Sequence, residues 1–142
     1  MHTETKKKVV VIGGGTGTFT LLQGLKQYSD LLHITKIVST TDSGGSNSRI
    51  RDEFGYLPLS DINRSLAALA TDIEEHDQLL RELFLYRFDK GNGLAGHNFG
   101  NLLLVALTDL LGSEAEAIKV ASKILSTHGE VLPVTSDDVH LV

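Results

Sequence analysis

The chain contains no cysteine and no tryptophan, only two prolines, and aromatic residues make up just 6% of its 142 residues. The absence of cysteine excludes disulfides and thiolate zinc sites. No apolar run approaches the roughly 20 residues that a membrane helix needs, and the first eight residues are polar where a secretory signal would be apolar. A net charge of -5 without a basic stripe argues against a nucleic-acid surface. We therefore expect a cytoplasmic protein that binds neither membranes nor nucleic acid.

The composition that remains is typical of one globular domain. Hydrophobic residues make up 41% of the chain and charged residues 22%, which is enough apolar material for a core at this length. The basic run at residues 6–8 is expected to be solvated and to end a polar tail over residues 1–8. Residues 9–142 are expected to form a single domain.

Residues 9–18 carry the most informative pattern of the chain. Four apolar, mostly β-branched residues lead into four glycines among five residues, and the segment that follows has helical spacing. A buried strand that passes through glycines into a helix predicts phosphate binding, because free N–H groups and the positive end of the helix dipole then point at an anion. Thr16 and Thr18 add hydroxyl groups to the same loop.

Two well-known phosphate motifs do not fit this loop. The dinucleotide fingerprint requires glycine at its sixth position, where this chain has Thr18, and a Walker A loop requires a lysine that is absent between Lys8 and Lys26. A tight turn without a ligand remains the plain structural alternative. If a phosphate binds, Gly15 is the position at which a larger side chain is expected to enter its path.

Hydrophobic spacing predicts an α/β chain with a Rossmann-like three-layer fold, a mostly parallel sheet and an inserted helical pair. The pair consists of two consecutive helices, the first of them capped by Ser60. The predicted strands are residues 9–12, 32–41, 131–134 and a last one from 139, and the predicted helices are residues 19–28, 60–70, 75–88, 98–111 and 113–128.

Two further loops are expected at the sheet edge that holds the glycines. Asp42 lies where doubly wound folds place a ribose-binding acid, but it could equally hold Mg²⁺ or cap the local backbone. Arg49 could clamp a phosphate or pair with neighbouring carboxylates. His97, at a helix start, could contact phosphate, act as an acid or base, or cap the helix. Without a nucleophile elbow or a histidine pair at metal-ligand spacing, hydrolase and zinc-enzyme classes are excluded.

A series of motifs follows in order along the chain, at residues 11–18, 42–46 with Arg49, 57–58 with Asp61, 96–97, 100–103 and 131–135. Together they resemble the 2-phospho-L-lactate transferase (CofD-like) superfamily. Within it the chain is most similar to the bacterial gluconeogenesis factor branch, which implies binding of a UDP-sugar or an NAD-like nucleotide and a role in cell shape. The other branch implies Mg²⁺-dependent transfer of phospholactate from a guanosine diphosphate-linked donor to a deazaflavin.

The resemblance implies that Asp42 and Asp61 are the candidate catalytic carboxylates and that Asp42 is the candidate Mg²⁺ ligand. Ser43 replaces a second acid that the branch usually has, which favours binding over transfer. Family members are longer, so we expect the chain to match their N-terminal half, and a homo-oligomer stays open. The predicted nucleotide-binding residues are Gly13, Gly14, Gly15, Thr16, Gly17, Thr18, Asp42, Ser43, Gly44, Gly45, Ser46, Arg49, His97, Asn98 and Asn101.

Overall fold

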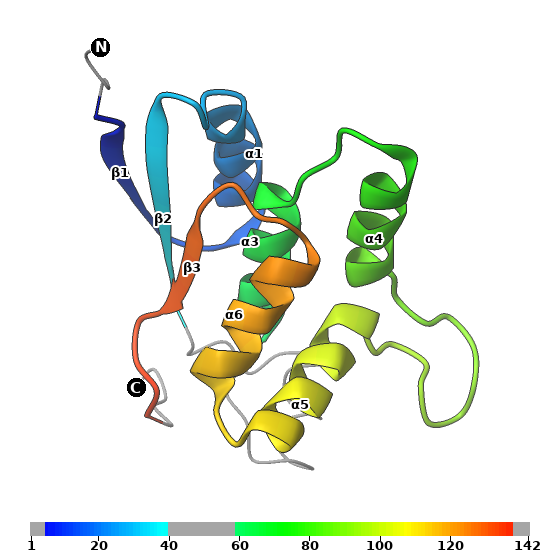
Figure 1. Cartoon of the computed structure of the whole chain (residues 1–142). Coiled ribbons are helices and arrows are strands. Elements are labelled where there is room, and N and C mark those ends of the chain that lie inside the picture. Colours follow the sequence, from blue (N-terminus) through cyan, green and yellow to red (C-terminus); the bar gives the residue numbers. More distant parts are fainter. Residues whose placement is uncertain (1–4, 40–58, 138–142) are drawn as a thin grey trace.

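The computed structural model describes residues 5–39 and 59–137 of the chain. Figure 1 shows a small sheet at one side of these residues and the helices at the other. The strands are β1 (Lys7–Ile12), β2 (Leu32–Val38) and β3 (Glu130–Pro133). The helices are α1 (Gly15–Lys26), α3 (Ser60–Leu69), α4 (Glu75–Leu85), α5 (Phe99–Leu111) and α6 (Glu114–Ile124).

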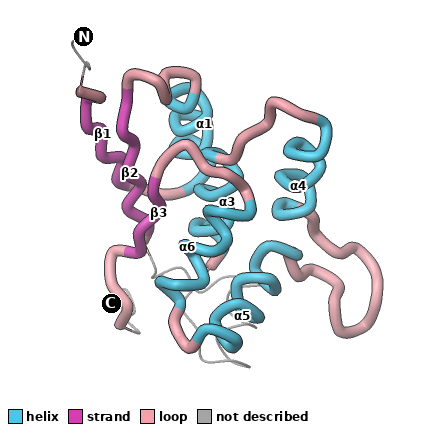
Figure 2. Tube along the Cα trace, viewed as in Figure 1, coloured by secondary structure: helices cyan, strands magenta, loops and turns pink. Residues whose placement is uncertain are grey.

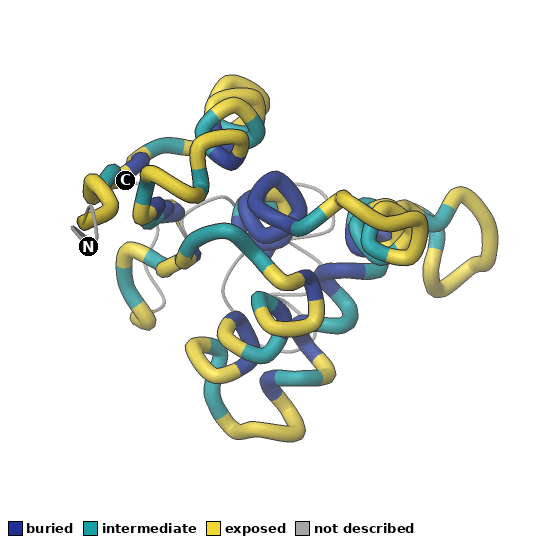
Figure 3. The backbone as a smooth tube through the Cα atoms, turned by 45° about the horizontal axis from the view of Figure 1, so that its top comes forward, coloured by how far each residue is buried: buried dark blue, intermediate teal, exposed yellow. Residues whose placement is uncertain are grey.

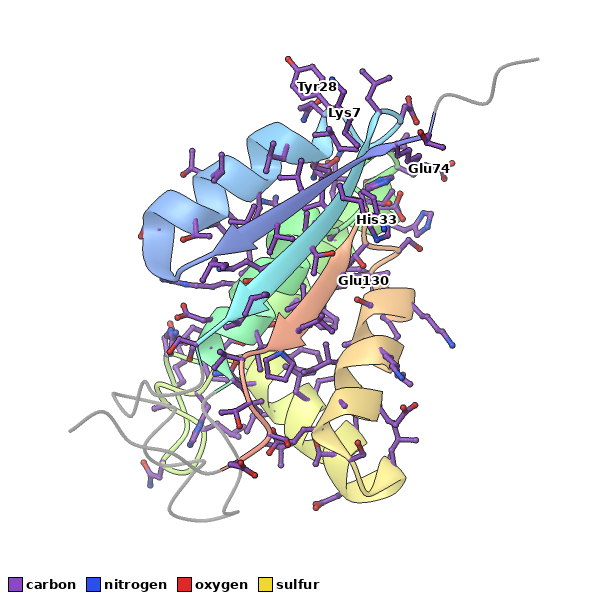
Figure 4. All side chains as sticks on the ribbon, turned by 90° about the vertical axis from the view of Figure 1, so that its left-hand side faces the viewer. Lys7, Tyr28, His33, Glu74 and Glu130 are labelled. Atoms are coloured by element: carbon purple, nitrogen blue, oxygen red, sulfur yellow. The ribbon has the colours of Figure 1, made fainter. Side chains whose placement is uncertain are left out.

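The sheet is parallel throughout these residues, with β2 between β1 and β3. Val11 lies opposite Lys36, and Ile37 lies opposite Leu132. Because α1 connects β1 to β2, the first 38 residues contain a βαβ unit, as the strand and helix spacing predicts. The carboxyl ends of the strands meet at one edge. Figure 4 labels His33 and Glu130 near the starts of β2 and β3, whereas the arrowheads point to the opposite edge, where α1 begins.

The helices pack on one face of the sheet (Figure 2). On that face Val11, Ile34 and Val38 are buried, whereas Val10 and Ile12 on the other face are 57% and 76% exposed. This alternation follows from the pleat, which turns successive side chains to opposite faces. The described residues therefore contain the sheet and one layer of helices.

Helix α3 is the centre of the core. Ile62, Leu66 and Leu69 are fully buried on it, and the small residues Ala67 and Ala68 are buried as well. The helix contacts α1, α4, α5 and α6, and it also contacts β2 and β3. Figure 3 shows the buried segments gathered at the middle of the molecule and exposed segments around them. Elements that hold functional groups near the amino end of α3 are therefore supported by the most tightly packed part of the chain.

The α/β class, the parallel sheet and the consecutive helices α3 and α4 are confirmed. Several boundaries were wrong. β1 begins at Lys7, inside the expected polar tail, because Lys7 and Lys8 pair with Leu32 and His33 of β2. Helix α1 begins at Gly15 rather than at residue 19, so residues 15–18, most of the expected glycine loop, are helical. The strand predicted from residue 139 lies outside the described residues.

Helix caps agree in part with the sequence. Ser113 caps α6 by accepting a hydrogen bond from the backbone nitrogen of Glu116 at 3.3 Å, as predicted. Leu59, not Ser60, is the cap residue of α3, and Ser60 is its first helical residue. None of the helices in the described residues has both the length and the apolar composition that a bilayer crossing requires.

Candidate functional site

The glycines after β1 form a short connection to an uncapped helix. Gly13 has a φ of +140° and Gly15 a φ of +74°, conformations that side chains rarely adopt. Gly14 is the cap residue of α1, so no side chain accepts from the first turn, and that turn contains no acidic residue. Gly14 to Gly17 are exposed. The amino end of α1 therefore has backbone N–H groups that are free to bind an anion.

A buried lysine of β2 holds this connection by a hydrogen bond to its backbone. Lys36, on the inner face of β2, is 1% exposed, and its ammonium group donates to the carbonyl oxygens of Gly13 and, at 3.1 Å, Ile37. Burial lowers the pKa of Lys36 below its ordinary 10.5, and the negative charge of Asp61 partly opposes this shift. The lysine thus fixes the backbone at Gly13 and places a positive charge beneath the glycines.

Asp61, in the first turn of α3, faces the same glycines. A Cβ atom at Gly14 would lie 2.7 Å from the Oδ2 atom of Asp61, so a side chain there would have to displace the carboxylate. A Cβ atom at Gly15 would meet nothing within 4 Å. A side chain at Gly14 would therefore displace Asp61, whereas one at Gly15 would be strained by the positive φ. That a larger residue at Gly15 enters the path of a bound phosphate stays a prediction.

We call the small cavity at this point the glycine-loop pocket. Its volume is about 10 Å³, which leaves room for about one water molecule. A phosphate group would have to bind at its mouth, against the first turn of α1. The pocket is lined by Gly14, Gly15, Thr18, Phe19, Lys36, Asp61, Arg64 and Ser65.

A buried asparagine joins the amino ends of α3 and α5. The Nδ2 atom of Asn63 donates to the carbonyl oxygen of Phe84 at 2.9 Å and to the Oδ1 atom of Asn98 at 2.7 Å. The same Oδ1 atom accepts from the backbone nitrogen of Asn101 at 3.1 Å and so caps α5. Asn63 lies so close to Gly100 that a Cβ atom at that residue would overlap its side chain. Gly100 is thus a packing requirement of this junction.

A second cavity, which we call the asparagine pocket, opens beside this junction. It has a volume of about 220 Å³. Asn101 is fully buried, and its Nδ2 atom donates to the hydroxyl of Ser60 at 3.1 Å, but its Oδ1 atom has no hydrogen-bond partner. An unpaired buried acceptor of this kind costs about 1–3 kcal/mol. The pocket is lined by Ser60, Asn63, Arg64, Leu85, Arg87, Asn98 and Asn101.

Three helix amino ends therefore meet at one place. The contact of Gly14 with Asp61 brings α1 to α3, and the hydrogen bond between Asn101 and Ser60 brings α5 to α3. The place lies beyond the carboxyl end of β1, where ligands of open α/β sheets bind. The geometry suits a ligand that carries negative charge, since each helix contributes about half a positive charge at its amino end.

The sequence-predicted residues occupy different positions around this place. Thr16, Gly17 and Thr18 lie in the first turns of α1, and the hydroxyl of Thr18 donates to the carbonyl oxygen of Gly14 at 2.7 Å, so its proton already has a partner within the helix. Asn98 is the cap of α5, with its Oδ1 atom accepting two hydrogen bonds. His97 is 5% exposed and lines neither pocket.

The second predicted loop cannot be placed relative to these pockets. Asp42, Ser43, Gly44, Gly45, Ser46 and Arg49 all lie outside the described residues. Over residues 5–39 and 59–137, no three histidine, cysteine or acidic side chains gather in a group that could hold a metal ion. Mg²⁺ needs only one or two carboxylates when phosphate and water supply its other ligands. By that criterion Asp61, beside the glycines, fits as a magnesium ligand.

Comparison with known proteins identifies the family. Residues 9–142 match the family described as 2-phospho-L-lactate transferase CofD. The chain belongs to this family. Among curated CofD relatives, a protein of Nostoc is 54% identical over 134 residues, which are 94% of this chain and 28% of that protein. The gluconeogenesis factor of Bacillus subtilis is 44% identical over 136 residues, 96% of this chain and 41% of the relative.

A solved structure supports the fold of this CofD family member. The crystal structure of a protein from Bacillus halodurans matches with a TM-score of 0.84 and 45% sequence identity, over 94% of this chain and 41% of that one. The similarity to gluconeogenesis factors agrees with the resemblance that the sequence motifs indicate. The chain spans about 28% to 41% of the length of these relatives.

Sequence reasoning missed several residues of the site, most clearly Lys36 and Arg64. A signal for Lys36 was present. It lies two residues from Ile34 and two from Val38, both inward-facing, in a strand rich in β-branched residues, so it is expected on the same face. Arg64 follows Asp61 by three residues on a helix, and such a pair lies on one face. No local pattern marks Asn63, because its partners Phe84 and Asn98 are 21 and 35 residues away.

Proposed function

We propose that the chain binds a nucleotide through its phosphate groups, with a UDP-sugar as the first candidate and an NAD-like dinucleotide as the next. The observation that carries the proposal is the uncapped amino end of α1, reached through Gly13 and Gly14 and placed beside Lys36 and Arg64. Both candidate ligands contain a diphosphate, which suits free backbone N–H groups at a helix end.

The relatives support a binding role. Several carry the name gluconeogenesis factor, which designates a factor and no reaction. In the described residues only one carboxylate, that of Asp61, lines the glycine-loop pocket. A regulatory protein that responds to the nucleotide concentration needs affinity for the nucleotide and a change of conformation, but no general base. The glycines and cations of the glycine-loop pocket can supply that affinity.

Calorimetric titration tests the proposal. UDP-N-acetylglucosamine, NAD and GDP are titrated into the protein, with and without Mg²⁺. We expect UDP-N-acetylglucosamine to bind with micromolar affinity in the absence of metal. Gly14→Val should abolish that binding, because its side chain would displace Asp61 and lie over the amino end of α1. Lys119→Ala, on the exposed part of α6, serves as the control with unchanged affinity. Absence of binding by any of the three nucleotides to the folded protein would refute the proposal.

One observation favours a second function, a Mg²⁺-dependent transferase of the kind that the family description names. The carboxylate of Asp61 lies directly against Gly14. A phosphate bound at this glycine would be repelled by the negative charge of the carboxylate. A magnesium ion between the two would remove that repulsion and neutralise charge during transfer. This function predicts that GDP binds only with Mg²⁺ and that Asp61→Asn removes the metal dependence. Equal GDP affinity with and without metal would exclude it.

A further inference from the structure

Among residues 5–39 and 59–137, Arg64 alone lines both the glycine-loop pocket and the asparagine pocket. It lies in the second turn of α3, between the amino end of α1 on one side and that of α5 on the other. The side chain is exposed, and among the described residues no hydrogen bond or ion pair engages its guanidinium group. A free guanidinium between two pockets is available to a ligand that occupies both.

The charges around the glycines leave Arg64 as the surplus cation. In the part of the chain that the structure describes, three ionisable side chains line the glycine-loop pocket, those of Lys36, Asp61 and Arg64. Lys36 donates to two backbone carbonyl oxygens and its charge interacts with that of Asp61. Arg64 therefore gives the pocket its excess positive charge. Guanidinium binds phosphate oxygens through two parallel hydrogen bonds, which fixes the orientation of the phosphate.

The asparagine pocket requires a different partner. Among the described residues, the Oδ1 atoms of Asn63 and Asn101 are both buried acceptors without a donor, and the Nδ2 atom of Asn101 donates to Ser60. Its volume of about 220 Å³ exceeds the roughly 150 Å³ of an engineered cavity that binds benzene, so one ring with its substituents fits. A hydroxyl-bearing ring suits the volume of the pocket and the polar side chains that line it.

We propose that Arg64 binds the phosphate chain of the nucleotide where the two pockets meet, and that a hydroxyl-bearing ring of the same ligand enters the asparagine pocket beside Asn101. The inference rests on the proposed nucleotide binding and adds to it the direction in which the ligand lies. The phosphates face the amino end of α1, and the ring lies between the amino ends of α3 and α5. Arg87, which already donates to the carbonyl oxygen of Gly96 at 2.7 Å, borders the ring.

Two variants separate the two halves of the ligand. Affinity for UDP-N-acetylglucosamine and for inorganic pyrophosphate is measured by calorimetry for Arg64→Ala and Asn101→Leu. Arg64→Ala is expected to weaken both ligands by tenfold or more, and Arg64→Lys to restore part of the loss. Asn101→Leu is expected to weaken the nucleotide-sugar by about fivefold or more and to leave pyrophosphate unchanged. Lys119→Ala controls for a general loss of positive charge.

The outcomes distinguish this inference from the function on which it rests. If the wild-type protein binds neither ligand, the proposed function fails and the inference fails with it. If the wild type binds and Arg64→Ala binds equally well, only the inference is overturned. If Asn101→Leu weakens pyrophosphate as strongly as the nucleotide-sugar, the assignment of the ring to the asparagine pocket is overturned. Urea unfolding of each variant shows whether a loss of affinity reflects loss of the fold.

Discussion

Lys36 shows how a charged side chain can be part of a sheet interior. It lies in the central strand, yet its ammonium group reaches the carbonyl oxygen of Gly13 at the sheet edge. Long lysine side chains often place an apolar stem among core residues in this way while the charged end meets polar groups. The lysine connects the packing of β2 to the backbone that a phosphate would contact.

The lowered pKa of Lys36 predicts a pH-dependent stability. Between that lowered pKa and the ordinary 10.5 the unfolded chain binds more protons than the folded one, so the free energy of unfolding rises with pH in this window. Lys36→Met removes the titration. In urea unfolding at pH 7.5 and pH 10, the wild type should therefore gain stability relative to Lys36→Met at the higher pH. Equal pH dependence in the two proteins would contradict the assignment.

Gly100 and Gly24 are matched glycines in two helices. A Cβ atom at Gly100 would overlap Asn63 and lie 2.5 Å from the carbonyl oxygen of Phe84, whereas one at Gly24 would meet nothing within 4 Å. Gly100→Ala should therefore lower the free energy of unfolding by about 1–3 kcal/mol. Gly24→Ala should raise it by about 0.5–1 kcal/mol, because alanine restricts the unfolded chain and favours helix. Urea unfolding measures both, and a neutral Gly100→Ala would refute the packing role.

Single residues of the site differ in how far the sequence reveals them. Gly13 and Gly14 could be predicted because the strand before them and the helix after them are both local patterns. Asn63 and Arg64 could not be assigned roles, since their neighbours come from α4 and α5, remote in sequence. Asn98 and Asn101 were predicted together as ligand contacts, but only the fold shows that one caps α5 and the other carries an unpaired oxygen.

At the scale of elements, an ion pair between a buried lysine and a partly exposed aspartate connects α1 to the segment between α3 and α4. The ammonium group of Lys26, 6% exposed in the last turn of α1, donates at 2.9 Å both to the carboxylate of Asp72 and to the carbonyl oxygen of Ala70. The hydrogen bond from Lys26 lowers the pKa of Asp72 below its ordinary 3.8. The pair holds the end of α1 against the end of α3.

The Lys26–Asp72 pair predicts a loss of stability in acid. Because the pKa of Asp72 is lower in the folded state, its stabilisation is present above pH 3.8 and is lost as the pH falls through the lowered value. The carboxylate is 43% exposed, so we expect Asp72→Asn to cost under about 1 kcal/mol at pH 7. In urea unfolding at pH 7 and pH 3, the difference between the two proteins should shrink at the lower pH. Glu116→Gln, in an exposed pair, is the control.

Most elements could be predicted, and their ends could not. The periodicity of β1, β2 and the five helices is a local property, so the order of the described elements follows from the sequence. The start of β1 at Lys7 depends on pairing with β2. The start of α1 at Gly15 depends on the backbone conformation at Gly13, which the hydrogen bond from Lys36 helps to fix. These contacts join residues 23 or more positions apart, which local spacing does not detect.

At the scale of the whole molecule, the two faces of the sheet differ. The helices cover one face (Figure 4). The side chains of Val10, Ile12 and Leu132 on the other face are exposed. Apolar groups that lie close together on a surface bind hydrophobic dyes and promote association. Ile12→Thr should therefore reduce the fluorescence of bound anilinonaphthalene sulfonate and leave the free energy of unfolding within about 0.5 kcal/mol.

The buried neighbour of Ile12 provides the comparison. Val11→Thr changes a residue that is 6% exposed and should lower the free energy of unfolding by about 1 kcal/mol or more, because the hydroxyl enters the core between β1 and the helices. If both variants changed stability equally, the two faces would not differ in the way that the described residues show.

Because three helix amino ends meet at one place, we expect the melting temperature of this protein to depend on the anion in the buffer. Without a ligand, the partial positive charges of α1, α3 and α5 lie near one another and near the guanidinium groups of Arg64 and Arg87. An oxyanion that occupies this place binds the folded state alone and therefore stabilises it. Sulfate or phosphate should raise the melting temperature above that in chloride at equal ionic strength, and Arg64→Ala should reduce the difference.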